Sequence, residues 1–182
     1  MITLEKVCFA YEHEVALRYV NLQIEKGDSV VIQGPNGCGK STLIRLLNGI
    51  IYPSEGHYFY KNHEITEKSL KDRQFAKWFH QQMGYVFQNA DTQLFCGSVE
   101  EEIAFGPVQM GLSETEIRQR TEDCLQLFGI EKLRERPPYH LSGGEKRKVS
   151  LACILSLNPE VLILDEPLAG LDEKTQDMLL EF

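Results

Sequence analysis

The sequence predicts an α/β fold with an antiparallel β subdomain at its N-terminal end and an inserted α-helical subdomain. Three observations predict it. Apolar and polar residues alternate along residues 1–25, a glycine-rich loop at 34–42 lies between a β-branched run and a helical pattern, and helix-start signals replace strand patterns over 89–140. We therefore expect a core in which strands alternate with helices around this loop.

One domain is expected over residues 1–182, because a chain of this length can bury a core of its own. Its α/β core and β subdomain are assigned to 1–88 and 141–182, and its helical subdomain to 89–140. The 42% hydrophobic and 25% charged content is ordinary for a globular protein. No apolar run approaches the roughly 20 residues of a membrane span, and residues 1–6 show no signal-peptide pattern. A cytosolic protein is expected.

Charge and cysteine content weigh against other classes. The formal net charge of −8 disfavours a nucleic-acid partner, since such proteins usually carry a basic stripe. The five cysteines form no C-x-x-C pair and the five histidines have no metal-ligand spacing, which argues against a disulfide framework and structural zinc. Only Lys146–Lys148 is densely basic. We interpret it mainly as a solvated helix face, with a phosphate-facing role for one member as the less favoured alternative.

The first 25 residues show strand alternation that ends at the turn Lys26–Asp28 and predicts antiparallel β structure. The glycine-rich loop then matches the phosphate-loop pattern G-x-x-x-x-G-K-[ST]. Ser29–Ile32 is expected to be the buried parallel strand before it, and Leu43–Ile50 shows the spacing of a helix face after it. The predicted phosphate-binding residues are Gly34, Pro35, Asn36, Gly37, Cys38, Gly39, Lys40, Ser41 and Thr42.

The chemistry of this loop follows from its residue types. Glycines let backbone N–H groups turn toward phosphate oxygens, and the helix N-terminus adds positive partial charge. Lys40 is expected to contact the β- and γ-phosphates, and Ser41 to offer its hydroxyl to Mg²⁺. Cys38 has two interpretations: a redox switch, since helix N-termini lower thiol pKa values, or a tolerant variable position, which we prefer.

Beyond the loop, His57–Tyr60 is expected to be a strand, the segment from Leu70 to Phe79 a helix, and Met83–Gln88 a buried strand with a polar end. Capping-box patterns then start helices at Ser98, at Ser113 and at Ser142. Gly129 and the pair Pro137-Pro138 are stop signals, as is Asn158-Pro159 after the third of these helices.

Val161–Leu164 predicts a further buried strand, and two acids follow it at the end where ligands bind in parallel α/β sheets. Asp165 is the candidate Mg²⁺ ligand, and Glu166 could orient or deprotonate an attacking water. The alternative is an ordinary exposed strand end, which the apolar run leading into the acids disfavours.

The order of these motifs resembles the ATP-binding subunit of an ABC transporter. The order runs from the phosphate loop through Gln88, the helical subdomain, Leu141–Glu145 and Asp165-Glu166 to Ala169–Asp172. The resemblance covers nearly the whole chain and implies a P-loop NTPase fold of the ABC type, with ATP and Mg²⁺ as cofactors.

The resemblance also implies roles. Tyr11 would stack on adenine, with a core tyrosine as the alternative. Gln88 would be the lid glutamine that senses Mg²⁺ and the attacking water, and Glu166 the catalytic base. The implied catalytic residues are Glu166, Lys40 and Gln88, and the implied Mg²⁺ ligands are Ser41, Gln88 and Asp165. The family's signature residues would contact the γ-phosphate of ATP bound to a second subunit, so that ATP holds a dimer together. Here these residues are Ser142, Gly143, Gly144 and Glu145.

Two stretches, Gln88–Phe95 and Glu100–Pro107, resemble the energy-coupling-factor and cobalt/nickel importer ATPases in particular. In that group this surface receives a coupling helix from a membrane subunit; generic packing in the helical subdomain is the alternative. Leu168 departs from the family, where many members have a small hydroxyl residue. The chain also stops at Phe182, and no histidine follows His140 to act as the family's switch histidine. We expect these 182 residues to bind ATP but to hydrolyse it weakly or not at all.

The leading hypothesis is a subunit that energises uptake of cobalt or nickel ion, or of a vitamin, by ATP-driven dimer closure. The expected partners are a second ATPase subunit, identical or related, and an integral membrane transport subunit, and no nucleic acid is expected. The protein would then lie on the cytoplasmic face of the cell membrane. Two alternatives stay open: a non-transport ATPase acting on DNA or ribosomes, which should show basic surfaces and long insertions, and a nucleotide-binding module without catalysis.

Overall fold

The computed structural model describes residues 1–87, 93–166, 168 and 170–180. The chain divides into two compact units, Met1–His80 and Gln81–Phe182. Within the described residues, no helix is both long enough and apolar enough to cross a membrane.

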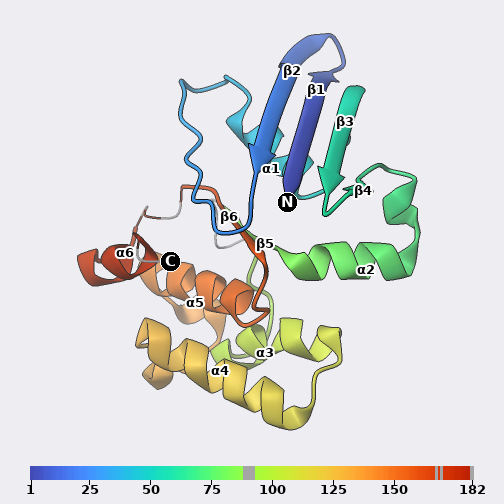
Figure 1. The fold of residues 1–182 in the computed structure, drawn as a ribbon. Coiled ribbons are helices and arrows are strands. Elements are labelled where there is room, and N and C mark those ends of the chain that lie inside the picture. The colour runs from blue at the N-terminus through green and yellow to red at the C-terminus, as the bar shows by residue number, and fades with distance from the viewer. Residues whose placement is uncertain (88–92, 167, 169, 181–182) are drawn as a thin grey trace. The chain divides into compact units, whose positions relative to one another are not determined.

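An antiparallel sheet dominates the first unit (Figure 1). Its strand order is β2-β1-β3-β4, and Ile2 pairs with Ile24 on one side and Tyr60 on the other. The strand bounds are β1 (Ile2–Tyr11), β2 (Glu14–Ile24), β3 (Glu55–Tyr60) and β4 (His63–Glu64). The antiparallel structure predicted ahead of the loop is confirmed, as is the strand predicted at His57–Tyr60.

Two helices belong to this unit, α1 (Lys40–Leu47) and most of α2 (Arg73–Gln82), with a short 3₁₀ helix at Ser69–Lys71. The Tyr58 hydroxyl donates a hydrogen bond of 2.8 Å to the Leu47 carbonyl, which joins β3 to the end of α1. Burial raises the pKa of Tyr58, so this donor keeps its proton at neutral pH. The unit thus fixes the helix that follows the glycine-rich loop.

The predicted buried strand at Ser29–Ile32 is wrong. Residues 28–35 have no regular secondary structure, and Val31 is 75% exposed. A strand needs a neighbour for its ladder hydrogen bonds, and no described residue pairs with this run, so β-branched composition does not suffice. Ile50, predicted on the buried face of the next helix, is also exposed, because α1 ends before the left-handed Gly49.

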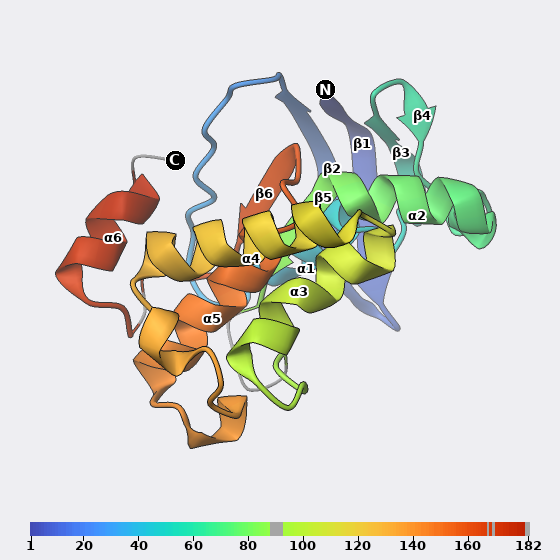
Figure 2. The same cartoon turned by 90° about the horizontal axis from the view of Figure 1, so that it is seen from below.

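The second unit pairs β5 (Met83–Val86) with β6 (Val161–Leu164) in parallel, with Val86 opposite Leu164. Helices α3, α4 and α5 lie side by side (Figure 2). The helix bounds are α3 (Val99–Met110), α4 (Glu114–Phe128), α5 (Gly143–Leu155) and α6 (Glu173–Leu180), with 3₁₀ helices at Glu131–Leu133 and Pro138–His140. One apolar cluster joins these helices to β5. The predicted boundaries of the helical subdomain stay a prediction.

The predicted caps are confirmed with one difference. Ser113 begins α4 with a complete capping box, and Gly129 ends it with a φ of 62°. At α3 the Ser98 hydroxyl accepts from the Glu101 N–H at 3.2 Å, but the Glu101 carboxylate accepts from Gly97 at 3.1 Å instead of completing the box. The acid therefore orders the residue that precedes the cap.

Candidate functional site

The phosphate loop lies in the first unit and ends in a left-handed glycine. Gly39 has a φ of 97° and forms the N-cap of α1. A Cβ at this position would lie 2.4 Å from the Ala16 carbonyl oxygen, so only glycine allows the loop to pass this close to β2. The first turn of α1 therefore begins immediately after a backbone turn that no larger residue could make.

The Lys40 side chain folds back across the loop. Its ammonium donates to the Gly34 carbonyl at 2.8 Å and to the Pro35 carbonyl at 2.9 Å. These bonds hold a positive charge over a loop that leads into a helix N-terminus. Such an arrangement is suited to bind an anion with several oxygens.

Cys38 lies exposed in the same loop, with its sulfur 4.0 Å from the Lys40 ammonium nitrogen. A Cβ at position 34 would lie 2.6 Å from this sulfur, so Gly34 makes room for the thiol. Neither of the two interpretations of Cys38 follows from this contact.

Tyr11 ends β1 with its ring 41% exposed and edge-to-face against Phe9, at 4.9 Å between ring centres. Hydrogen bonds with the Thr42 and Arg45 side chains lower the pKa of the Tyr11 hydroxyl. The exposed ring does not fit the alternative of a core tyrosine. It presents an aromatic face, and its hydroxyl is joined to the phosphate-loop helix.

The two predicted acids follow β6 in the second unit. The Asp165 N–H donates to the Val86 carbonyl at 3.2 Å, so the strand pairing extends one residue beyond β6. Glu166 is exposed and adopts a left-handed backbone with a φ of 49°. This conformation is uncommon outside glycine, and such strain often marks functional positions.

The interpretation of Lys146–Lys148 as a solvated helix face is wrong for its central residue, Arg147. Arg147 is only 4% exposed, and its guanidinium donates to the carbonyls of Phe87, Asp165 (2.9 Å) and Glu166 (3.1 Å). Burial lowers the pKa of Arg147, and the nearby charges of Asp165 and Glu166 oppose this shift. Sequence reasoning missed this residue, although its spacing of four from the buried Leu151 places both on one face of α5.

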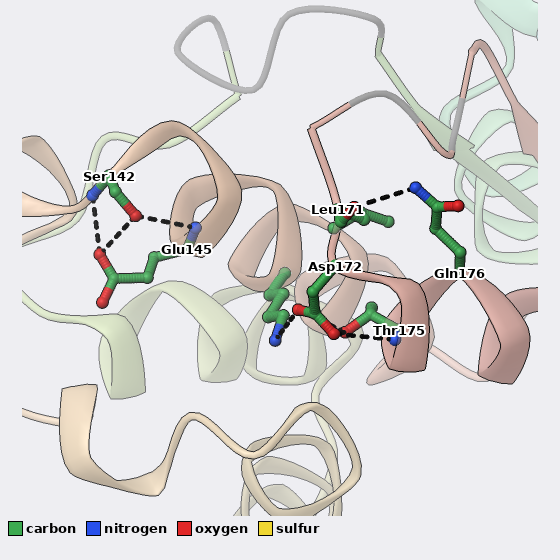
Figure 3. Close-up of polar contacts among 7 residues, drawn as sticks. Ser142, Glu145, Leu171, Asp172, Thr175 and Gln176 are labelled. Atoms are coloured by element: carbon green, nitrogen blue, oxygen red, sulfur yellow. Dashed lines mark hydrogen bonds and ion pairs between the residues drawn. The ribbon is translucent and has the colours of Figure 1, made fainter.

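The signature turn is pre-formed at the start of α5 (Figure 3). Ser142 and Glu145 make both halves of the predicted capping box: the Ser142 N–H donates to the Glu145 carboxylate at 2.8 Å, and the Glu145 N–H donates to the Ser142 hydroxyl at 3.4 Å. The Ser142 hydroxyl also donates to the Glu145 carboxylate at 2.8 Å. These bonds lower the pKa of Glu145. A Cβ on Gly144 would approach the Gly170 carbonyl to 3.0 Å, so the turn lies against the segment that leads into α6.

Asp172 fixes that segment (Figure 3). Its carboxylate accepts from the Thr175 N–H at 3.0 Å and forms an ion pair of 2.6 Å with Lys148 of α5. The Lys148 ammonium, with help from Thr175, lowers the pKa of Asp172 to about 2. Gln176 adds hydrogen bonds to the carbonyls of Leu168 and Leu171.

A buried acid also orders the surface at Gln93–Phe95. Glu102 of α3 accepts from the Phe95 N–H at 2.8 Å and the Cys96 N–H at 2.6 Å. The Phe95 ring, 68% exposed, stacks edge-to-face on Phe105 with 5.0 Å between ring centres. Two aromatic rings are thereby held at the surface.

The structure thus groups the predicted residues in two sets. The phosphate loop and Tyr11 belong to the first unit, and the acids and the signature turn belong to the second. Gln88 and the four residues after it lie outside the described residues. In the described ranges no three His, Cys, Asp or Glu side chains are placed to hold a metal ion. The Ser41 hydroxyl and Asp165 carboxylate are nevertheless the hard oxygen donors that suit Mg²⁺, which usually takes one or two protein ligands beside phosphates.

Residues 17–169 match the family described as ABC transporter. The nickel import ATP-binding protein LarO of Lactiplantibacillus plantarum is 49% identical over 180 residues, which are 99% of this chain and 75% of LarO. The energy-coupling factor transporter ATP-binding protein EcfA of Methanoculleus marisnigri is 46% identical over 168 residues, which are 92% of this chain and 58% of EcfA.

Solved structures agree. CbiO1 from Clostridium perfringens, described as part of the ABC transporter complex cbiONQ, superposes with a TM-score of 0.85 at 39% identity, covering 99% of this chain and 72% of cbiO1. The dimeric ATP-binding cassette MJ0796 in a post-hydrolysis state, bound to ADP and Pi, superposes with a TM-score of 0.86 at 29% identity. The superposition covers 100% of this chain and 80% of MJ0796. The predicted fold and the predicted resemblance to the importer ATPases are confirmed.

Replacing Asp172 with Ala should loosen the start of α6, because the cap on Thr175 and the ion pair with Lys148 are both lost. Backbone amides of α6 should exchange with solvent faster, by about fivefold. In the parent the ionised carboxylate gives this protection above its unfolded pKa of about 4, and the protection is lost as pH falls toward about 2. Asp177→Ala, on an exposed position of the same helix, is the control, and equal exchange in the two variants would contradict the assignment.

Proposed function

The chain belongs to the ABC transporter family and is an ATP-binding subunit of a transporter with the family's ATPase activity; from this we propose that it powers the uptake of cobalt or nickel ion, or of a vitamin, by ATP-driven dimer closure. The observation that carries the proposal is the phosphate loop, in which Lys40 is held over Gly34 and Pro35. The likeness to LarO, a nickel import ATP-binding protein, supports a metal ion as the solute, and the likeness to EcfA supports a role in an energy-coupling factor transporter.

In the proposed binding mode the loop residues 34–42 surround the phosphates and Tyr11 stacks on adenine. The exposed Tyr11 ring and its contacts with Thr42 and Arg45 support this, because the aromatic face is positioned from the phosphate-loop helix itself. Ser41, Asp165 and Gln88 would hold Mg²⁺. When bound, this ion neutralises phosphate charge.

Hydrolysis is assigned to Glu166, which would accept a proton from the attacking water, and to Gln88, which would orient that water. Lys40 would stabilise charge on the transferred phosphoryl group. Phosphoryl transfer needs mainly positioning and charge stabilisation, so a small set of held groups is sufficient. The left-handed backbone of Glu166 supports the assignment, since strained positions concentrate at functional sites.

The signature residues Ser142–Glu145 would bind the γ-phosphate on a second subunit, identical or related. Their turn opens a helix N-terminus, which favours anions, and its capping box holds it ready without the ligand. The structure of MJ0796, which is dimeric with ADP and Pi bound, supports a dimer as the nucleotide-bound assembly.

The membrane partner is proposed to contact Phe95 and Phe105. The two stacked rings are exposed although Glu102 fixes the backbone beneath Phe95, and exposed rigid aromatics are typical of protein interfaces. CbiO1 is itself part of a transporter complex. The protein would then act at the cytoplasmic face of the membrane, and the net charge of −8 gives no reason to expect nucleic acid.

Lys40→Ala should weaken Mg-ATP binding by about 10- to 100-fold, because charge-assisted hydrogen bonds to phosphate are lost. Isothermal titration calorimetry measures this directly. Lys77→Ala, on an exposed position of α2, removes the same charge and should bind as the parent does. Unchanged affinity in Lys40→Ala would refute the assignment of the phosphate loop.

Glu166→Gln in the full-length protein should trap a dimer with ATP bound, because the amide keeps the shape of the side chain but accepts no proton. Light scattering with saturating Mg-ATP should report twice the monomer mass. Glu173→Gln makes the same change at an exposed residue of α6 and should not trap the dimer. A Glu166→Gln variant that stays monomeric would contradict the shared-site arrangement.

The tagged full-length protein should co-purify with a polytopic membrane protein from detergent-solubilised membranes of its own cells. Phe95→Ala should lower the yield of that partner by about tenfold or more, as loss of a buried aromatic contact does at interfaces. Tyr139→Ala, at another exposed aromatic residue, should not. Recovery of soluble partners alone would favour the non-transport ATPase.

A further inference from the structure

Arg147 is a buried arginine whose three described hydrogen bonds go to backbone carbonyls. Buried guanidinium groups are rare unless their donors are satisfied, since leaving water costs them hydration. Here the acceptors are the carbonyls of Phe87, Asp165 and Glu166. These three hydrogen bonds tie the guanidinium to the backbone of two chain segments that lie far apart in the sequence.

These carbonyls follow directly after the two parallel strands of the second unit, β5 and β6. Among the described residues, the ladder bond farthest along the two strands runs from the Asp165 N–H to the Val86 carbonyl. Beyond it, β5 leads through Phe87 toward Gln88, and β6 leads through Asp165 to Glu166. The guanidinium bridges the two chain segments directly after β5 and β6.

The hydrogen bond from Arg147 to the Glu166 carbonyl bears on the backbone conformation of Glu166. Its φ of 49° is unfavourable for a residue with a side chain, so the surrounding structure must hold it there. A charged donor on the Glu166 carbonyl, 3.1 Å away, fixes the orientation of that peptide group. The direction in which the Glu166 side chain leaves the backbone is fixed with it.

We propose that Arg147 is a positioning residue for ATP hydrolysis: it holds the Asp165 and Glu166 peptide groups against the end of β5, and so keeps the Glu166 carboxylate aimed at the attacking water. This inference rests on the proposed role of Glu166 as the base. Arg147 itself touches neither nucleotide nor water in this role. Its effect on hydrolysis passes through the backbone of Asp165 and Glu166.

A purely structural arginine would behave differently in one measurable respect. It would change the fraction of molecules that fold and bind ATP, but not the rate at which each bound ATP is hydrolysed. A positioning residue changes that rate, because displacing a reacting group by about 1 Å can cost about 100-fold. The deciding quantity is the single-turnover rate per bound ATP in the full-length protein.

The test compares Arg147→Met, which removes all donors, with Arg147→Lys, which keeps one charged group. Arg118→Met makes the same change at an exposed position of α4 and serves as the control. We expect the rate per bound ATP to fall by about 10- to 100-fold in Arg147→Met, and less in Arg147→Lys, with the ATP dissociation constant within about threefold of the parent. If Arg147→Met does not fold, the Lys variant decides the question alone.

A double mutant adds a second criterion. In the Glu166→Gln background, Arg147→Lys should lower the residual rate little further, since a residue that acts through Glu166 has nothing left to position. Equal rates per bound ATP in the parent and in both Arg147 variants would overturn the proposal, as would fully additive losses in the double mutant. If the parent and Arg118→Met bind ATP but do not hydrolyse it, the proposed catalytic function fails and this inference fails with it.

Discussion

The hydrogen bonds from Arg147 to the carbonyls of Phe87, Asp165 and Glu166 are the interaction on which the functional end of the second unit depends. In the described part of the chain, strand pairing reaches Asp165, and the residues with proposed chemistry begin at that point. Buried backbone carbonyls that follow a strand need hydrogen-bond partners, and a side chain can supply them. Arg147 does so from α5, the helix that begins at the signature turn.

In the first unit a cationic side chain also donates to backbone carbonyls of an irregular segment. Lys40 donates to the Gly34 and Pro35 carbonyls, and so the loop holds its own cation in place before any phosphate arrives. In both units a cation on a helix satisfies main-chain oxygens of an irregular segment. Acids play the complementary part: Glu102 and Asp172 accept from backbone N–H groups that precede or open a helix.

Sequence reasoning found the features that depend on local physics. Period-two alternation located β1 and β2, and the patterns of Ser113 and Ser142 located helix starts, because a cap is made by residues close together in the chain. The predictions from sequence are wrong where contacts with a distant segment of the chain decide the structure. The run Ser29–Ile32 has the composition of a strand but no described neighbour to pair with, and Arg147 is buried because carbonyls from two distant segments meet there. The residues of the candidate site were readable from motifs, whereas the side chain that holds the acids in place was not.

The choice of carbonyls as acceptors has a genetic consequence. Every residue has a carbonyl, so no substitution at positions 87, 165 or 166 removes an acceptor for Arg147. All three hydrogen bonds are lost together when residue 147 is replaced by one whose side chain has no donor. For these hydrogen bonds the constraint on sequence therefore falls on one codon, that of residue 147, whereas the side chains of Asp165 and Glu166 are constrained by their own proposed roles.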